Sequence, residues 1–435
     1  MAAIEWLGGT LAQAQALARE QRRPLFLYWG AVWCPPCNRV KSDIFARDEF
    51  AARTASVLCY QLDGDGAGAQ AQAARHGLRS YPTLVLFAPD GGEITRLPCE
   101  LDGELFVSAF DTALAVHRAG SSAAAALEAA LAGARALSAD EWSLLSHYSW
   151  DTDEARLLGT RALAPTLSAL AGTASAGGHA DAAARLGLHA QLASGVGDAA
   201  ALLAILADAR MARANLDIFN DHGLQLVKIA GRREELAAAL GGVAAQWADD
   251  LWFSLPDRLM AARLQLRMAR LLAPSQGLQE RVRARVEQAL AESTDPYQRH
   301  TLVNTAVSAL NDAGLTAQAE QVLLAELPRS HSPYYFMLSL AAGAKRRNDV
   351  AGVLDWYGKA WQASVGAATR IQWGVTYLNS LLELAPQDSA RVARAVEGVL
   401  ADLQAAGDDA RQQRNLSQLQ KLASKHASLP AALRA

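Results

Sequence analysis

Cysteine is scarce in this chain of 435 residues, with only four, at Cys34, Cys37, Cys59 and Cys99. That number excludes a fold held together by many disulfides. A surplus of basic residues is also missing, because the formal net charge is −3. We therefore expect no general binding of nucleic acid. Hydrophobic residues make up 51% of the chain and charged residues 20%, a mix that excludes a mainly disordered protein.

Long hydrophobic runs are missing as well. No segment offers about 18 consecutive apolar residues, so we expect no transmembrane helix. The stretch from Met1 to Arg19 lacks the basic start and the apolar run of a secretory signal. We expect a cytoplasmic protein, and a periplasmic one if a signal peptide has been removed from the chain.

The first quarter of the chain alternates between two hydrophobic patterns. Apolar runs of strand length predict strands at 24–30, 56–62, 83–87 and 93–97. Helical patterns lie between them, in a stretch that ends near Arg22 and at 36–46, 67–76 and 103–118. Asp90-Gly91-Gly92 predicts a hairpin turn between the last two strands. Residues 1–118 are therefore expected to form an α/β domain with a mixed sheet.

The rest of the chain, residues 121–435, reads as helices alone. Apolar residues recur at helical spacing between short Gly, Asp or Pro turns. Stacked helix pairs accommodate such a length more easily than one bundle. Val322 and Trp356 lie 34 residues apart at corresponding helix positions, and the stretch 352–360 resembles the second helix of a tetratricopeptide repeat. We expect a tetratricopeptide-like helical-repeat region, with an irregular helical array as the alternative.

The motif Trp33-Cys34-Pro35-Pro36-Cys37 carries the clearest chemical signal. It follows an expected strand and opens the next helix, where backbone N–H groups favour a thiolate. Cys34 is therefore expected to be the exposed, attacking thiol, and Cys37 the shielded thiol that resolves the mixed disulfide. The alternatives are two inert buried thiols or a zinc site. Zinc would need further ligands at short spacing, and the histidines are scattered singly, so we expect no metal and no cofactor.

Residues 1–118 resemble the thioredoxin fold, closest to bacterial thioredoxin-like domains. The stretch 29–34 (WGAVWC) matches the family's strand-to-helix junction, and 79–87 (RSYPTLVLF) matches its second signature. The resemblance implies a redox-active disulfide between Cys34 and Cys37 and a cis peptide bond at Pro82, to which a trans turn proline is the alternative. It also implies a substrate groove lined by Trp33, Tyr81, Pro82 and Thr83.

Two positions depart from the family pattern. Tyr28 stands where many thioredoxins keep a buried aspartate six residues before the first cysteine, and Cys59 stands where a lysine commonly pairs with it. The usual proton relay is therefore missing, and Cys59 is expected to pack as a small apolar side chain. Cys99 aligns beside the groove. We favour an incidental thiol there over one that exchanges with Cys34.

No catalytic motif follows residue 120. Aromatic residues gather late in the helical part, and we interpret them either as filling between helices or as lining a concave groove for a peptide or protein. The residues of this late aromatic set are Tyr334, Tyr335, Phe336, Trp356, Tyr357, Trp361, Trp373 and Tyr377.

Together these patterns predict a thiol–disulfide oxidoreductase that acts on disulfide-containing protein substrates. Its electron donor would be a thioredoxin-reductase-type or glutathione system, and its helical region would recruit the substrate or a partner. One alternative is an interaction scaffold or holdase with a redox-regulated thioredoxin-like docking module. Another is that the helices shield the active site.

Overall fold

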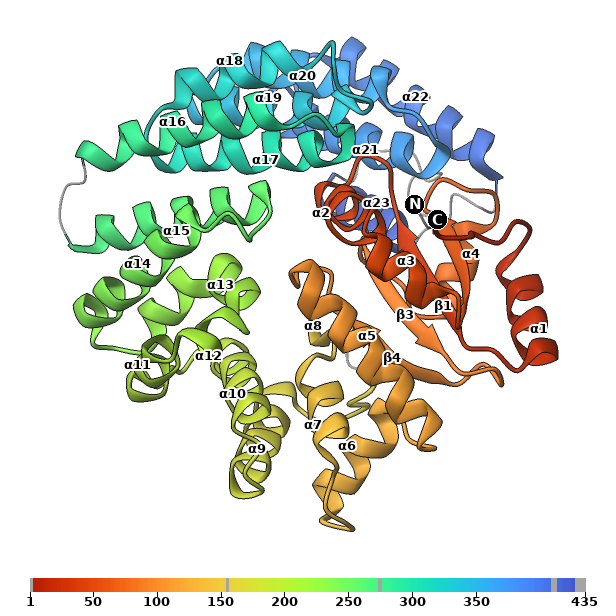
Figure 1. Ribbon diagram of the computed structural model, residues 1–435. Helices are drawn as coiled ribbons and strands as arrows, with labels where there is room; N and C mark the ends of the chain where they lie inside the picture. Colours follow the sequence, from red (N-terminus) through yellow and green to blue (C-terminus); the bar gives the residue numbers. More distant parts are fainter. Residues whose placement is uncertain (1–2, 154–155, 273–275, 408–412, 427–435) are drawn as a thin grey trace. The chain divides into compact units, whose positions relative to one another are not determined.

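The computed structural model of the protein describes residues 3–153, 156–272, 276–407 and 413–426. A four-stranded sheet in the order β2-β1-β3-β4 forms the framework of the N-terminal part. Figure 1 labels β1, β3 and β4 of this sheet. Its strands are β1 (Leu25–Gly30), β2 (Leu58–Asp63), β3 (Thr83–Phe87) and β4 (Glu93–Leu97). Every residue of β1 and β3 is buried, as their uninterrupted apolar sequences require for the two central strands.

Short helices flank these strands along the chain. They are α1 (Leu11–Gln21), α2 (Pro35–Arg39), the π-helix η1 (Val40–Phe45), α3 (Asp48–Thr54), α4 (Ala69–Arg75) and α5 (Gly103–Arg118). The Thr10 side chain begins α1 in a capping box with Gln13. The Asp102 side chain begins α5 by accepting hydrogen bonds from the amides of the first turn.

The expected α/β arrangement is confirmed, and the bounds of β3, β4 and α5 are those predicted. The predicted hairpin is also present: β3 and β4 pair antiparallel, the Ala88 amide donates to the Gly92 carbonyl, and Gly91 has a φ of 94°. Glycine reaches that backbone conformation without steric cost, which explains the turn sequence.

Three local expectations were inaccurate. The helix expected at 36–46 begins one residue earlier and changes to π geometry, with the Ala46 amide bonding to the Lys41 carbonyl. The strand expected from residue 56 begins at Leu58, because the amides of Ser56 and Val57 bond back to the end of α3. Helix α3 itself was not predicted.

Every element described after residue 121 is a helix. In the order of the chain these helices are α6 (Ala123–Ala132), α7 (Ala139–Ser146), α8 (Trp150–Asp153), α9 (Leu163–Ala176), α10 (Ala180–Ser194), α11 (Ala199–Ala207), α12 (Ala209–Arg213), α13 (Leu216–Ile229), α14 (Arg233–Asp249), α15 (Leu255–Leu272), α16 (Gln276–Glu292), α17 (Pro296–Asp312), α18 (Thr316–Glu326), α19 (Pro333–Arg346), α20 (Val350–Ala363), α21 (Ala367–Leu384), α22 (Ser389–Ala406) and α23 (Gln413–Lys425).

The chain folds into two compact units that each combine distant segments. The first unit comprises Met1–Tyr28, Asn38–Gln61 and Pro82–Leu315. The second comprises Trp29–Cys37, Leu62–Tyr81 and Thr316–Ala435. After residues 118–121 every described element is a helix. The two compact units do not divide there, because each contains segments from before and after these residues.

Neighbouring helices pack in pairs within each unit. In the first unit, α9 lies beside α10 and α14 beside α15 (Figure 1). An apolar core that includes Phe219, Leu240 and Trp247 stabilises part of this unit. In the second unit, α19 lies beside α20 and α21 beside α22, over a core that includes Ile371 and Leu378. The tetratricopeptide-like character of these pairs stays a prediction.

Within the described residues, no helix is both long enough and apolar enough to cross a membrane.

Candidate functional site: the Cys34–Cys37 segment

Cys34 and Cys37 lie where β1 ends and α2 begins, inside the second unit. The Cys37 amide donates a hydrogen bond to Cys34 Sγ over 3.4 Å. A backbone N–H aimed at the sulfur stabilises its ionised form, which is the nucleophile in disulfide exchange. Cys34 Sγ also lies 3.7 Å from the Tyr81 carbonyl oxygen, to which the thiol donates. Both cysteines are free thiols in the structure.

Two of the predicted groove residues meet beside these cysteines. The rings of Trp33 and Tyr81 are 5.9 Å apart in an edge-to-face arrangement, and Trp29 packs on Tyr81 at 5.0 Å. The Tyr81 hydroxyl accepts a hydrogen bond from Gln70 Nε2 over 3.0 Å. Burial raises the pKa of Tyr81 above its ordinary value, so its hydroxyl stays neutral. Tyr81 is thus a fixed wall of the site rather than an acid or a base.

The other two predicted groove residues, Pro82 and Thr83, lie at the start of β3 and are buried. Their place in the chain puts the Tyr81 carbonyl directly before Pro82. The cis form of the bond at Pro82 and the contact of these residues with substrate stay predictions.

The expectation that Cys34 is exposed was wrong. Only 4% of Cys34 and 0% of Cys37 are accessible to solvent. We predicted an exposed Cys34 only because it lies between a strand and a helix. In the structure, the neighbouring Trp33 is covered by side chains from α19 and α21. Burial raises the pKa of the Tyr335 phenol to about 12, and the charge that Cys34 carries when it is a thiolate adds to this rise.

Trp33 contacts two C-terminal helices of the second unit, α19 and α21. Its ring stacks on Tyr335 at 5.8 Å with an interplanar angle of 19°, and meets Trp373 at 5.3 Å. Its Nε1 donates to Thr369 Oγ1 over 2.8 Å. Thr369 in turn bonds to Asp65, in the loop after β2.

Two members of the late aromatic set, Tyr335 and Trp373, thus pack on the cysteine segment itself. The set was predicted to fill space between helices or to line a concave groove for a peptide or protein, and the contacts of these two residues with Trp33 were not predicted. Asp65 and Thr369 were missed as well, because neither belongs to a recognisable motif. An unusual density of aromatic side chains after residue 333 was the one available signal.

The departures from the family pattern lie in the first unit. Tyr28 is buried in β1, where its ring packs against Trp6 and Phe45. Burial raises the pKa of Cys59 to about 12, so this thiol is neutral near pH 7. Cys59 also forms a parallel bridge with Trp6 at the edge of the sheet. These contacts are those of the small packing residue that we expected at Cys59.

Cys99 is also buried in the first unit, with 6% of its surface accessible. Its thiol donates to the carboxylate of Glu100 over 2.7 Å. This local partner suits an incidental thiol, and exchange of Cys99 with Cys34 stays a prediction that we do not favour.

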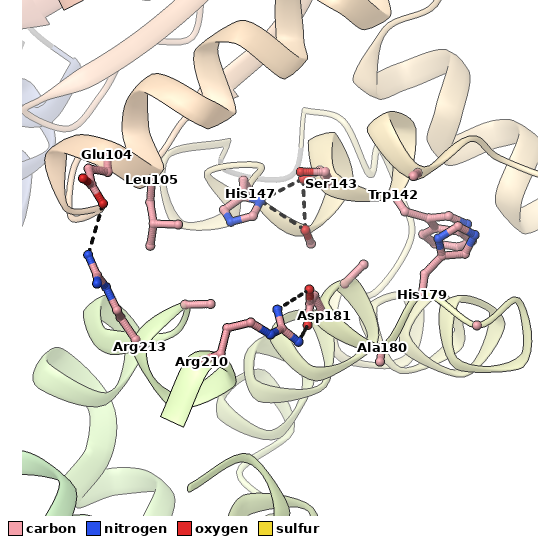
Figure 2. A pocket seen from close by; sticks show the side chains of 15 residues that line it. Glu104, Leu105, Trp142, Ser143, His147, His179, Ala180, Asp181, Arg210 and Arg213 are labelled. Atoms are coloured by element: carbon pink, nitrogen blue, oxygen red, sulfur yellow. Dashed lines mark hydrogen bonds and ion pairs between the residues drawn. The ribbon is translucent and has the colours of Figure 1, made fainter. Parts of the chain in front are cut away.

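A separate pocket of about 700 Å³ opens in the first unit, among α5, α7, α10 and α12 (Figure 2). Arg210 pairs there with Asp181 over 2.7 Å, and Arg213 with Glu104 over 3.1 Å. No cysteine is among the described residues that line it. Because these charges neutralise one another across the pocket, we assign it no chemistry.

A search of the described part of the chain finds no group of three or more His, Cys, Asp or Glu side chains arranged to hold a metal ion.

A thioredoxin-like domain family matches residues 11–114. The N-terminal part of the chain is a thioredoxin-like domain. No curated protein matches the chain. One similar solved structure, described as a DsbH oxidoreductase, is 20% identical, with a TM-score of 0.24, and the match covers 26% of this chain and 88% of that one. A likeness this weak carries no argument about activity, so the chemistry must be argued from the site.

Proposed function

We propose that this protein is a thiol–disulfide oxidoreductase that uses the Cys34–Cys37 pair on protein substrates. The observation that carries the proposal is the hydrogen bond from the Cys37 amide to Cys34 Sγ, 3.4 Å long. It joins the two cysteines across one helical turn and stabilises the thiolate that must attack. The match of residues 11–114 to a thioredoxin-like domain supports the same chemistry.

The proposed reaction proceeds in two exchanges. The Cys34 thiolate attacks one sulfur of a substrate disulfide, forming a mixed disulfide and releasing the other substrate sulfur as a thiolate. Cys37 then loses its proton and attacks Cys34 Sγ, which releases the second substrate sulfur. The substrate has gained two electrons and two protons, and the enzyme holds a Cys34–Cys37 disulfide. A dithiol donor of the thioredoxin-reductase type, or glutathione, returns it to the reduced state.

The compartment sets the net direction of this exchange. In a reducing compartment the pair is kept as two thiols and the protein acts as a reductase, whereas an oxidising periplasm also permits isomerase activity. Recruitment of substrate by the helical region is part of the proposal. Contacts between α21 and Trp33 support a role for that region at the site itself.

Reduction of insulin with dithiothreitol as electron donor tests the proposed activity. We expect Cys34→Ser to lose all turnover above the uncatalysed rate, because it removes the nucleophile. Cys37→Ser should instead accumulate a mixed disulfide with the substrate. Cys59→Ala is the matched control, since Cys59 is a buried free thiol outside the second unit, and it should keep the parental rate. Full activity in Cys34→Ser would overturn the proposal.

A second function, that of an interaction scaffold or holdase, is favoured by one observation. Only 4% of Cys34 is accessible to solvent. A docking module does not need an accessible thiol, whereas an enzyme that exchanges disulfides does. The insulin assay separates the two, because a scaffold gives no turnover even in a variant whose Cys34 has become accessible. Suppression of insulin aggregation that survives Cys34→Ser would then identify the holdase.

A further inference from the structure

The second unit places a layer of C-terminal side chains directly on the cysteine segment. Trp33 stacks on Tyr335 of α19 and meets Trp373 of α21 edge to face. Only 7% of Trp33 and 3% of Thr369 are accessible to solvent. The Trp33 indole, predicted to line the substrate groove, is therefore already covered by side chains of α19 and α21.

A chain of hydrogen bonds holds this layer in place. Trp33 Nε1 donates to Thr369 Oγ1 over 2.8 Å, and the same hydroxyl donates to Asp65 Oδ2 over 2.6 Å. The Thr369 amide donates to the other carboxylate oxygen of Asp65 over 2.9 Å. One threonine thus connects the residue before Cys34 with the loop after β2. Bonds to a carboxylate are stronger than those between neutral groups.

The backbone before α21 is adapted to this carboxylate. Gly366 has a φ of 97°, and a Cβ atom there would lie 2.1 Å from Asp65 Cγ. A residue other than glycine would therefore push the carboxylate away from Thr369 as well as strain the backbone. A second contact involves the residue that precedes Trp33: His331 Nε2 is 3.2 Å from the Val32 carbonyl oxygen.

Disulfide exchange needs direct access to the attacking sulfur. The incoming disulfide must approach Cys34 Sγ closely enough for the two sulfurs to bond, so a sulfur that is almost fully buried cannot react without local opening. Burial and the charge of Cys34 raise the pKa of Tyr335 to about 12, which agrees with its position close to this sulfur.

We propose that Tyr335, Thr369 and Trp373 form an autoinhibitory cap that keeps Cys34 latent, and that the Trp33–Thr369–Asp65 hydrogen bonds are its latch. The cap must move away from Trp33 before a substrate disulfide can reach Cys34. This inference rests on the proposed function only in its use of Cys34 as the nucleophile. Its physical content, restricted access to one sulfur, can be measured without any turnover.

Alkylation of the full-length protein tests the latch. The reduced protein is treated with iodoacetamide under native conditions, and the labelling rate of each cysteine is followed by peptide mass spectrometry. Thr369→Val keeps the shape of the side chain but removes both hydroxyl hydrogen bonds. Since one of the lost bonds is to a charged carboxylate, which is stronger than a bond between neutral groups, we expect Cys34 to react about tenfold faster or more. Asp65→Asn, which weakens the carboxylate contact, should raise the rate less.

The chain supplies its own controls for this experiment. Thr376→Val changes the same residue type on the same helix, but the Thr376 hydroxyl bonds only to the Gln372 carbonyl, so Cys34 should keep its parental rate. Cys59 and Cys99, buried in the first unit, report unfolding. The proposal is overturned if Thr369→Val leaves Cys34 at the parental rate. It is also overturned if Cys59 accelerates as much as Cys34 in both Thr369→Val and Asp65→Asn.

Insulin reduction by the same variants separates the two proposals. Faster labelling of Cys34 together with faster insulin reduction in Thr369→Val supports both the cap and the oxidoreductase. Faster labelling with no insulin reduction supports the cap and contradicts the proposed function. Slow labelling in a parent protein that already reduces insulin at the rate of Thr369→Val supports the function and contradicts the cap.

Discussion

Arg39, two positions after Cys37, forms a buried ion pair with Asp257. Removing this pair should lower the stability of the protein. Arg39 Nη2 lies 2.6 Å from Asp257 Oδ1, and the two side chains are 10% and 3% accessible to solvent. The guanidinium also donates to the Glu100 carbonyl, and Ser254 donates to the second carboxylate oxygen. All four residues belong to the first unit. The pair thus anchors the end of α2 to the start of α15.

We expect Asp257→Asn to lower the free energy of unfolding by about 3 kcal/mol, because Arg39 loses its partner at 2.6 Å and keeps, among the described residues, only Asp43 as a buried ion-pair partner, whose carboxylate lies 3.7 Å from Nε. Two unit charges 2.6 Å apart attract by about 6 kcal/mol at an effective dielectric constant of about 20. Burial of both ions offsets much of that attraction. Combining Asp257→Asn with Arg39→Met should therefore cost less than the sum of the two single changes.

Urea unfolding followed by far-ultraviolet circular dichroism measures these differences. Asp181→Asn is the matched control. Its ion pair with Arg210 is 2.7 Å long, nearly the same as that of Asp257, but the side chains are 59% and 64% accessible. An exposed pair contributes at most about 1 kcal/mol, so this variant should be nearly as stable as the parent.

The comparison isolates burial, since distance and chemistry are matched. Equal, small losses in Asp257→Asn and Asp181→Asn would contradict this prediction, because they would mean that Asp43 or solvent compensates the Arg39 charge when Asp257 is neutral. A double variant that loses the full sum of the two single changes would refute the claim that the ions stabilise each other.

Two further predictions concern His147, which is buried, and Gly64, which lies against Tyr81. Burial and the charge of Arg185 lower the pKa of His147 from 6.5 to about 4, so the unfolded chain binds the proton more tightly. The contribution of His147 to stability should therefore be constant above pH 6.5 and fall by at most about 1.4 kcal/mol per pH unit between pH 6.5 and about 4. It is measured as the difference between the parent and His147→Asn in urea unfolding across pH, and an unchanged slope in the variant would contradict it. Gly64→Ala would place a Cβ atom 2.0 Å from the Tyr81 hydroxyl and should cost about 1–3 kcal/mol of unfolding free energy. Gly172→Ala, at an open position of α9, should stabilise the protein instead, and equal effects of the two changes would disprove the packing argument.

Local elements were predictable where local chemistry fixes them. The bounds of β3, β4 and α5 follow from an apolar run, a hairpin turn with two glycines and an aspartate cap. At the start of β2 the hydrophobic pattern predicted the strand but placed its first residue too early. At η1 the pattern predicted a helix but not its π geometry. Helix α3 is only seven residues long and was missed because so short an amphipathic pattern is weak.

In the candidate site, the local geometry of the two cysteines was predictable, whereas the side chains that cover them were not. The spacing of Cys34 and Cys37 after a buried strand sufficed to bring them to one helical turn, and the hydrogen bond between them follows from that spacing. The contact of Trp33 with Tyr81 accords with the groove implied by the family resemblance. Shielding of the site by the helices was one alternative from the sequence, but the side chains that bury Cys34 could not be predicted, because no motif connects them with the cysteines.

The two candidate thiols can be identified from the sequence, because they are near neighbours in the chain and their geometry is that of a strand followed by a helix. Their accessibility depends on long-range packing. The bond from Trp33 to Thr369 joins residues 336 positions apart. Hydrophobic periodicity reports which face of a helix is buried but not which distant segment covers it. Access to Cys34 is therefore a property of the packed second unit rather than of the motif.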